Sequence, residues 1–245
     1  MIFTETVYPR VEDFDFHGQM TPSALLKAFE NVSSHHAKQV GISVMERSIN
    51  NGTAWMLTDW RVEILRTPTH KDKLLVETWL FRPNSSSRTS RELQMKDGAG
   101  NILARGSGRF ALVDLRTNLV AKASPEEAER YQPEQKTVFD NRLPRLRAPN
   151  EYSCEMPLAL RRSDIDYNGH VHNTAYLDLA LELVPDALLE EGIRSFRIVY
   201  RHPLKYGDAV QLRGGRANGG WVTSLYCGDT LCAIVALNEN LKPLA

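Results

Sequence analysis

The chain has 245 residues, of which 42% are hydrophobic and 24% are charged, a composition that excludes a disordered or collagen-like protein. Thirty basic and thirty acidic residues give a formal net charge of zero, so no overall field favours a nucleic acid or an anionic membrane as a partner. No apolar run approaches the roughly 20 residues that are needed to cross a bilayer.

The first predicted element is a long amphipathic helix over about residues 22–40. Thr21 supplies a capping side chain, Pro22 follows at the first helical position, and apolar residues recur at helical spacing up to Gly41. Four alternating segments come next, separated by turn-forming residues, and they cover residues 55–65, 74–81, 88–95 and 102–113. An antiparallel sheet is therefore expected after the helix.

The second half of the chain repeats this order. Residues 121–150 contain four prolines and no sustained periodicity, which predicts a linker between an N-terminal domain, residues 1–120, and a C-terminal domain, residues 151–245. In the C-terminal domain a helix is expected over about 173–184, broken at Pro185. Strands are expected near residues 195–200, 209–213, 221–227 and 231–237.

The two halves share residues as well as pattern. The segment that begins at Asp13 aligns without a gap with the one that begins at Asp164, and five positions between Asp13 and Leu26 are identical at an offset of 151 residues. Each repeat is expected to contain a strand, an Asp- and Gly-rich turn, a long helix and a run of antiparallel strands. A twisted sheet with one apolar face can bury such a helix, which predicts an α+β fold.

The densest polar chemistry lies in the turn ahead of the second helix. Asp166 could orient or deprotonate a water molecule, or attack as a nucleophile, while Asn168 and backbone N–H groups near His170 could donate to an oxyanion. His170 could hold the protonation state of the site. A purely structural interpretation stays open, because Asp and Asn commonly cap turns and helices. For the matching turn after Asp13 that structural interpretation is favoured.

The cysteines indicate the compartment. Cys154, Cys227 and Cys232 are an odd number, with no CxxC spacing and no nearby histidine cluster, which argues against a disulfide framework and against a zinc site. The N-terminus also lacks a basic region followed by an apolar stretch. We therefore expect a cytoplasmic protein that needs no metal and no dissociable cofactor.

The polar turn carries a resemblance to a known family. Asp-Ile-Asp-Tyr-Asn-Gly-His-Val-His-Asn-Thr-Ala-Tyr-Leu, which begins at Asp164, resembles the signature of hotdog-fold thioesterases. In the first half, residues 31–43, 60–64 and 75–79 look like the N-terminal repeat of acyl-acyl-carrier-protein thioesterases, including the plant plastid enzymes. The resemblance spans both halves. It implies a tandem (double) hotdog, with a catalytic C-terminal repeat and an N-terminal repeat that helps to bind the acyl chain.

This sequence departs from the family pattern at two places. Pro203 and Leu204 stand where the plant enzymes have Glu-Cys, so a cysteine nucleophile is not available on that strand. His172 replaces the first Asn of a paired Asn-Asn and leaves only Asn173, a candidate for substrate binding. The resemblance carries the family's catalytic residues over to Asp166, Asn168 and His170.

The expected activity is hydrolysis of fatty acyl-acyl-carrier protein (acyl-ACP) to a free fatty acid and the carrier thiol. An acyl-coenzyme A thioesterase and a noncatalytic module that binds acyl chains or carrier protein remain alternatives, and association into a homodimer is left open. The candidate apolar lining of the acyl site is Leu25, Phe29 and Trp55. The candidate docking groups for the acidic carrier protein are Arg161, Arg162, Arg194, Arg197 and Arg201.

A single catalytic site per chain is expected. By the 151-residue offset, Asp15 corresponds to Asp166, but His17 and Gln19 stand in place of the amide and the imidazole of the second turn. An aspartate without these partners can cap the turn but has no arrangement for polarising a thioester.

Overall fold

The computed structural model describes residues 1–42, 52–81, 87–140, 143–217 and 219–239. The chain forms two compact units. The first comprises Met1–Thr58 and Ile64–Asp140, and the second comprises Asp59–Glu63 and Asn141–Ala245. None of the helices in the described ranges is both long and apolar enough to span a membrane.

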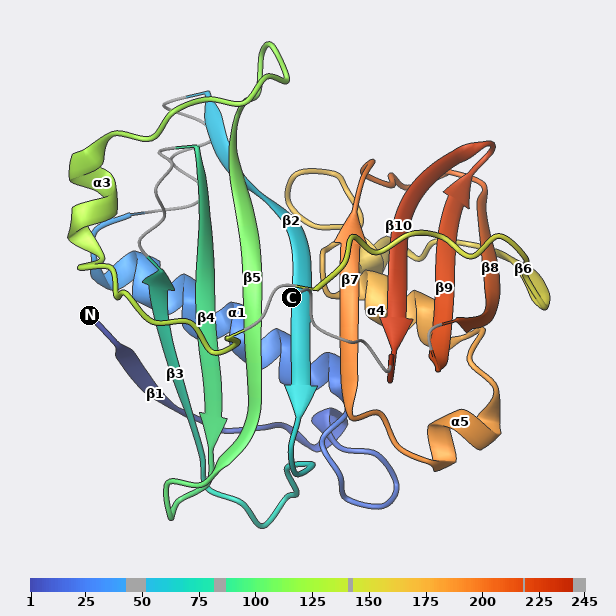
Figure 1. Ribbon diagram of the computed structural model, residues 1–245, viewed down its shortest axis with the longest axis horizontal. Coiled ribbons are helices and arrows are strands. Elements are labelled where there is room, and N and C mark those ends of the chain that lie inside the picture. Colours follow the sequence, from blue (N-terminus) through green and yellow to red (C-terminus); the bar gives the residue numbers. More distant parts are fainter. Residues whose placement is uncertain (43–51, 82–86, 141–142, 218, 240–245) are drawn as a thin grey trace. The chain divides into compact units, whose positions relative to one another are not determined.

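The first unit is a single helix layer on an antiparallel sheet (Figure 1). Its strands follow one another across the sheet in the order β1, β3, β4, β5 and β2. Their bounds are Phe3–Val7 for β1, Thr53–Ile64 for β2, Leu74–Phe81 for β3, Arg88–Lys96 for β4 and Ile102–Asp114 for β5. These bounds confirm the four strands expected after the helix.

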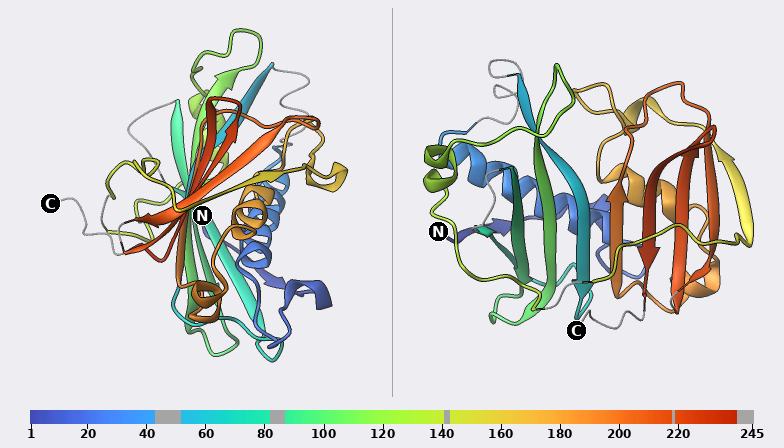
Figure 2. Two further views of the ribbon diagram at one scale, coloured as in Figure 1. Left: turned by 90° about the vertical axis from the view of Figure 1, so that its right-hand side faces the viewer. Right: turned by 45° about the horizontal axis from the view of Figure 1, so that its top comes forward.

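Helix α1, Pro22–Gln39, lies against one face of this sheet, as both views of Figure 2 show. The Oγ1 atom of Thr21 accepts the Ala24 N–H at 3.1 Å and so caps the helix, as the sequence predicts. Leu25 and Phe29, one turn apart on the inner face, are fully buried. Burial of this apolar stripe, more than helix propensity, holds α1 on the sheet.

The second unit repeats the plan with shorter helices. Its strands are β6 (Cys154–Leu158), β7 (Ser195–Tyr200), β8 (Val210–Ala217), β9 (Gly220–Cys227) and β10 (Thr230–Leu237), in the order β7, β10, β9, β8 and β6. Residues 59–63 of β2 belong to this unit and pair with β7. Helix α4, Ala175–Leu181, packs on β9 and β10.

The expected helix over 173–184 is shorter than predicted. It ends at Leu181, and a separate helix α5, Asp186–Glu190, begins after Pro185. Proline has no N–H to donate and disfavours helical backbone at the preceding residue, so the chain turns before it instead of continuing the helix.

The segment expected to be a linker has structure of its own. Helix α3, Pro125–Arg130, starts with Ser124, whose Oγ accepts the Glu127 N–H at 3.3 Å. Two hydrogen bonds then tie the segment to the first unit: the Trp79 indole N–H donates to the Lys136 carbonyl at 2.9 Å, and the Val138 N–H donates to Glu92 at 3.0 Å. The proline-containing segment is therefore a packed connector. The boundary between the two units falls after Asp140.

Candidate active site

The polar turn of the second unit lies between a short 3-10 helix, η2 (Arg162–Asp164), and α4. The Oδ1 atom of Asp166 accepts the N–H groups of Asn168 at 2.8 Å and of His170 at 3.2 Å. The amide side chain of Asn168 donates to Oδ2 of the same carboxylate at 3.3 Å. Gly169 sits between them with a φ of 75°, which glycine adopts without strain. One turn therefore brings the three predicted catalytic residues together.

Backbone donors near His170 are already engaged. Besides the two N–H groups held by Asp166, Gly169 donates to the Asp166 carbonyl at 3.0 Å, Val171 to Leu204 at 2.8 Å and His172 to Asp164 at 2.8 Å. The N–H groups of residues 168–172 are thus all used inside the protein. Because these N–H groups already have acceptors, they are not free to donate to an oxyanion in this structure, contrary to the expectation from the sequence. The side chains of Asn168 and His170 remain as donors.

The segment that follows β7 faces this turn. The Leu204 carbonyl accepts the Val171 N–H, and the Leu204 N–H donates to the Tyr176 hydroxyl at 3.0 Å. Tyr176 is 3% exposed, and burial raises the pKa of its phenol to about 12, with smaller contributions from Cys232, Asp208 and Asp166. The hydrogen bond from Leu204 therefore places the Tyr176 hydroxyl beside the segment that faces the polar turn.

Tyr176 and Asp208 are not among the site residues predicted from the sequence. Tyr176 belongs to the recognised motif, but its apolar neighbours indicate only a buried helix position. Asp208 accepts the Lys205 N–H at 2.8 Å and closes a turn, a use that the spacing Lys205-Tyr-Gly-Asp could have indicated.

The positions where the plant enzymes have Glu-Cys hold no reactive group. Pro203 is exposed, and Leu204 is fully buried. Cys232 lies nearby along β10, and its carbonyl accepts the Arg201 N–H at 2.8 Å. Burial raises the pKa of the Cys232 thiol to about 11, so it stays protonated near neutral pH and is a poor nucleophile.

The first unit contains the same turn. The Oδ1 atom of Asp15 accepts the N–H groups of His17 and Gln19, each at 2.9 Å, as Asp166 accepts those of Asn168 and His170. Met20 donates to the Pro68 carbonyl at 2.8 Å, as Val171 does to Leu204. The internal repeat is thereby confirmed at the level of single hydrogen bonds. Turn capping is common to both aspartates, but the other two side chains are exchanged, because His17 and Gln19 stand where the second turn has Asn168 and His170.

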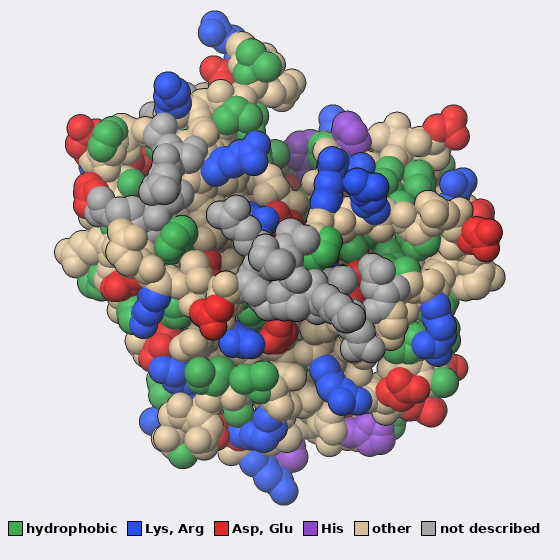
Figure 3. All heavy atoms as spheres, viewed as in Figure 1, with side chains coloured by type: hydrophobic (Ala, Val, Ile, Leu, Met, Phe, Trp, Pro, Cys, Tyr) green, Lys and Arg blue, Asp and Glu red, His purple; other side chains and the backbone are tan. Residues whose placement is uncertain are grey.

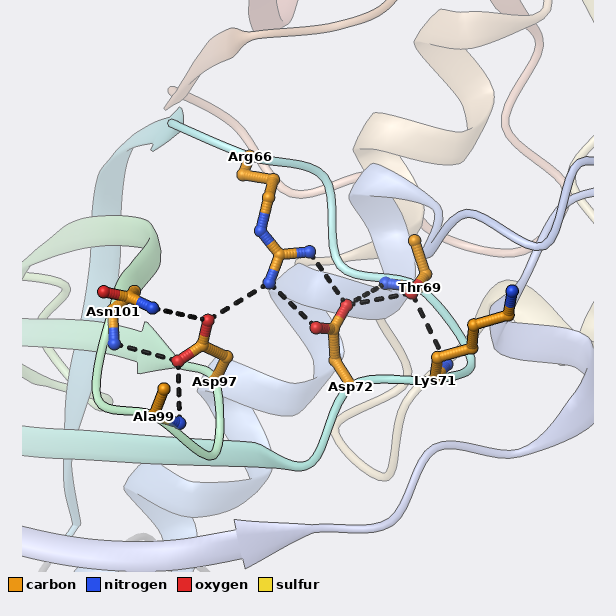
Figure 4. Close-up of polar contacts among 7 residues, drawn as sticks. All are labelled: Arg66, Thr69, Lys71, Asp72, Asp97, Ala99 and Asn101. Atoms are coloured by element: carbon orange, nitrogen blue, oxygen red, sulfur yellow. Dashed lines mark hydrogen bonds and ion pairs between the residues drawn. The ribbon is translucent and has the colours of Figure 1, made fainter.

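The loop facing the first turn is closed by ion pairs (Figure 4). The Arg66 guanidinium forks onto Asp72 with N–O distances of 3.1 and 2.8 Å and reaches Asp97 at 3.3 Å. The hydrogen bond from Arg66 is the main reason why the pKa of Asp72 lies well below its usual range. His202 occupies the position in the second repeat that Arg66 has in the first. The Arg66 N–H donates to the Leu103 carbonyl, and the His202 N–H donates to the matching carbonyl, that of Cys232. His202 is exposed.

The predicted acyl-chain lining belongs to the first unit. Leu25 and Phe29 are fully buried on α1, and Trp55 is half-buried, with its indole N–H donating to Glu127 at 3.3 Å. Asn173 stands next to the polar turn, and its backbone carbonyl accepts a hydrogen bond from the Tyr200 hydroxyl at 2.8 Å. Contact of these residues with substrate stays a prediction.

The five predicted docking arginines are not one cluster. Arg197 is 15% exposed and lies 3.4 Å from Glu239, so its charge is paired. Arg194 precedes β7 and Arg201 follows it, which separates them by about 20 Å along the strand. Arg162 lies over the Tyr206 ring at 4.6 Å, on the Arg201 side of the unit. Arg161 is forked onto Asp164, with its closest contact at 2.8 Å.

Figure 3 shows how charged side chains are distributed over one face of the molecule. Lys and Arg side chains are interspersed with Asp and Glu over most of it, while basic and histidine side chains gather over the upper ends of β7 and β10. The upper end of β7 is the end at which the strand leads into Arg201.

Family models match both halves of the chain in order. The model described as the acyl-ACP thioesterase N-terminal domain matches residues 1–131, and the model of the corresponding C-terminal domain matches residues 147–224. A chloroplastic oleoyl-acyl carrier protein thioesterase from Coriandrum sativum is 24% identical over 85% of this chain. A dodecanoyl-[acyl-carrier-protein] hydrolase from Cinnamomum camphora is 27% identical over 81%. The chain spans 61% and 56% of the length of these two relatives.

Solved structures match the whole described fold. A 12:0-ACP thioesterase from Umbellularia californica superposes with a TM-score of 0.87 at 22% identity, covering 99% of this chain and 98% of that one. An acyl-ACP thioesterase from Bacteroides thetaiotaomicron gives a TM-score of 0.82 at 20% identity, covering 96% of each chain. The tandem hotdog expected from the sequence is confirmed.

Proposed function

Since the chain belongs to the acyl-ACP thioesterase family, we propose that it hydrolyses the thioester of fatty acyl-ACP and releases a free fatty acid and the carrier thiol. The match of both family domains, in order, to the two repeats is the observation that carries this proposal. The catalytic turn lies in the second repeat, where Asp166, Asn168 and His170 stand together.

The hydrogen bonds of Asp166 support a different role for each of its two oxygens. Two backbone N–H groups donate to Oδ1, whereas Oδ2 receives, within the described part of the chain, only the longer hydrogen bond from the Asn168 amide. Oδ2 is therefore the atom that takes a proton from an attacking water or itself attacks the thioester carbonyl. When water attacks, the C–S bond breaks as the fatty acid forms, and the carrier leaves as a thiol after taking up a proton. When Oδ2 attacks, the carrier leaves in the same way and an acyl–Asp166 anhydride is left, which a water molecule then hydrolyses to the free fatty acid and the Asp166 carboxylate.

Asn168 and His170 donate hydrogen bonds to the oxygen of the same thioester carbonyl. The Asn168 amide has a second hydrogen to donate, and His170 presents a half-buried imidazole from the adjoining position of the turn. Donors that are fixed before the reaction stabilise the oxyanion as it forms, and loss of one donor typically slows turnover about 100- to 1000-fold.

The proposal includes a cytoplasmic location and acyl carrier protein as the carrier. All three cysteines are free, which supports a reducing compartment. The names of the curated relatives support the carrier.

A turnover assay over a panel of acyl-ACPs of different chain length tests this function. Release of the free carrier thiol is followed, with acyl-coenzyme A of the same chain lengths as the comparison. We expect hydrolysis of acyl-ACP with the higher kcat/KM. Hydrolysis restricted to acyl-coenzyme A would reassign the substrate, and tight acyl-ACP binding without turnover would reassign the protein as a binding module.

A further inference from the structure

Tyr176 is a buried phenol that holds a peptide N–H. Its ring lies on the inner side of α4 and packs edge-on against Tyr200, with the ring centroids 5.3 Å apart. Its hydroxyl accepts the Leu204 N–H at 3.0 Å. The residue is only 3% exposed, so a substrate that reaches the turn from solvent does not meet this hydroxyl directly.

Two successive hydrogen bonds connect Tyr176 to the catalytic turn. The hydroxyl fixes the N–H of Leu204, and the carbonyl of Leu204 accepts the N–H of Val171 at 2.8 Å. Val171 follows His170, whose own N–H is held by Asp166 at 3.2 Å. The position of the Leu204 backbone therefore affects where His170 and the carboxylate of Asp166 lie.

The first repeat shows that the fold does not require this phenol. Leu25 occupies the position of Tyr176, and Pro68, which has no N–H, occupies the position of Leu204. The turn is nevertheless paired in the same way, because Met20 donates to the Pro68 carbonyl at 2.8 Å. Replacing both partners of a buried hydrogen bond by apolar groups is close to neutral for stability. The chain thus keeps a buried polar pair only in the repeat that carries the catalytic turn.

We propose that Tyr176 is a positioning residue for thioester hydrolysis, which acts by holding Leu204 and, through it, the turn that carries Asp166 and His170. This proposal rests on the proposed function. Burial raises the pKa of the phenol to about 12, so the hydroxyl stays protonated and keeps the same hydrogen bond throughout the pH range of an assay.

Tyr176→Phe tests this role because it removes the hydroxyl and keeps the ring against Tyr200. Tyr152→Phe is the matched control: it also removes a hydrogen-bonded phenol from the second unit, one whose oxygen lies 3.1 Å from that of Tyr226. For Tyr176→Phe we expect kcat on acyl-ACP to fall at least tenfold with KM unchanged. Both variants should unfold near the temperature of the wild type, and Tyr152→Phe should retain its turnover.

A double-mutant cycle with Asp166→Asn separates positioning from general weakening of the fold. If Tyr176 acts through the turn, Tyr176→Phe causes no further loss once the Asp166 carboxylate is gone. An unchanged kcat in Tyr176→Phe, independent multiplicative losses in the double variant, or failure of Tyr176→Phe to fold would each overturn the proposal. Absence of turnover in the wild-type protein would instead overturn the proposed function itself.

Discussion

Two aspartates with the same hydrogen bonds have different surroundings in this chain. Asp15 and Asp166 each close a turn by accepting two backbone N–H groups on one oxygen. The second oxygen of Asp166 also receives a side-chain amide, from Asn168, and this amide has no counterpart at His17. A capping role and a catalytic role are therefore compatible within one carboxylate, because they use different oxygens.

A buried histidine gives the fold a predictable response to pH. His36 is fully buried on α1, its Nδ1 lies 3.1 Å from an Arg91 nitrogen of β4, and the rings of Phe3 and Tyr131 pack against it. Burial, and then the charge of Arg91, lower its pKa to about 4. Because an unfolded histidine titrates near 6.5, the stability that comes from the neutral ring is present above that pH and is lost as the pH falls toward 4.

Urea unfolding of wild type and His36→Gln at pH 7 and pH 5 measures this effect. We expect the wild type to lose about 2 kcal/mol more unfolding free energy than the variant between the two pH values, because only the wild type must keep the ring neutral. Equal losses in both proteins would contradict the assignment.

At the scale of elements, the strength of local signals decided what the sequence revealed. Helix α1 was predictable because Thr21 and Pro22 mark its start and its apolar stripe is long. From the sequence, strand β8 is expected to end at 213, because glycines such as Gly214 and Gly215 are typical of a break in a strand. In the structure β8 continues to Ala217. A Cβ at Gly214 would lie 2.7 Å from the Trp221 ring, so the strand needs glycine there for packing, a requirement that only the fold reveals.

The candidate site was predictable to a similar extent. The motif located the turn and its three polar side chains, since these are neighbours in the sequence. Tyr176 lies later in the same motif, and its partner Leu204 comes from the segment after β7, as does Asp208, so these contacts depend on how β7 and α4 pack. For the same reason the sequence did not reveal that Arg197 is paired with Glu239, and it predicted an exposed basic residue instead.

The two turns differ in how much space their glycines have. Gly18 and Gly169 have φ angles of 70° and 75°, so alanine at either position is strained by about 1 kcal/mol or more. A Cβ at Gly18 would also lie 2.8 Å from the His70 ring, whereas a Cβ at Gly169 would have no atom of the described residues within 4 Å. We expect Gly18→Ala to lower the unfolding free energy more than Gly169→Ala does, as urea denaturation would show. The reverse order would contradict the described turns.

At the scale of the whole molecule, the net charge is zero, so the proposed acidic carrier protein is expected to bind at a local patch. Arg201 follows the end of β7 that leads to Leu204 and the polar turn, and Arg162 lies over the ring of Tyr206 in that same segment, whereas Arg194 precedes the opposite end of β7. We expect Arg162→Glu and Arg201→Glu to raise KM for acyl-ACP several-fold and to weaken its salt dependence, with hydrolysis of short acyl-thiol analogues unaffected. Arg194→Glu is the matched control, and an equal rise of KM in this variant would argue against the patch.

The central claim is that one turn of the repeat, the second, carries the thioesterase chemistry. Asparagine at position 166 or 15 keeps an oxygen that accepts the backbone N–H groups, so both turns stay capped while the carboxylate is lost. The direct test is kcat on acyl-ACP for wild type, Asp166→Asn and Asp15→Asn, each checked for folding. The account predicts a loss of about 100-fold or more in Asp166→Asn, the scale of an essential transition-state contact, and nearly full turnover in Asp15→Asn. Near wild-type turnover in Asp166→Asn, or equal losses in both variants, would contradict it.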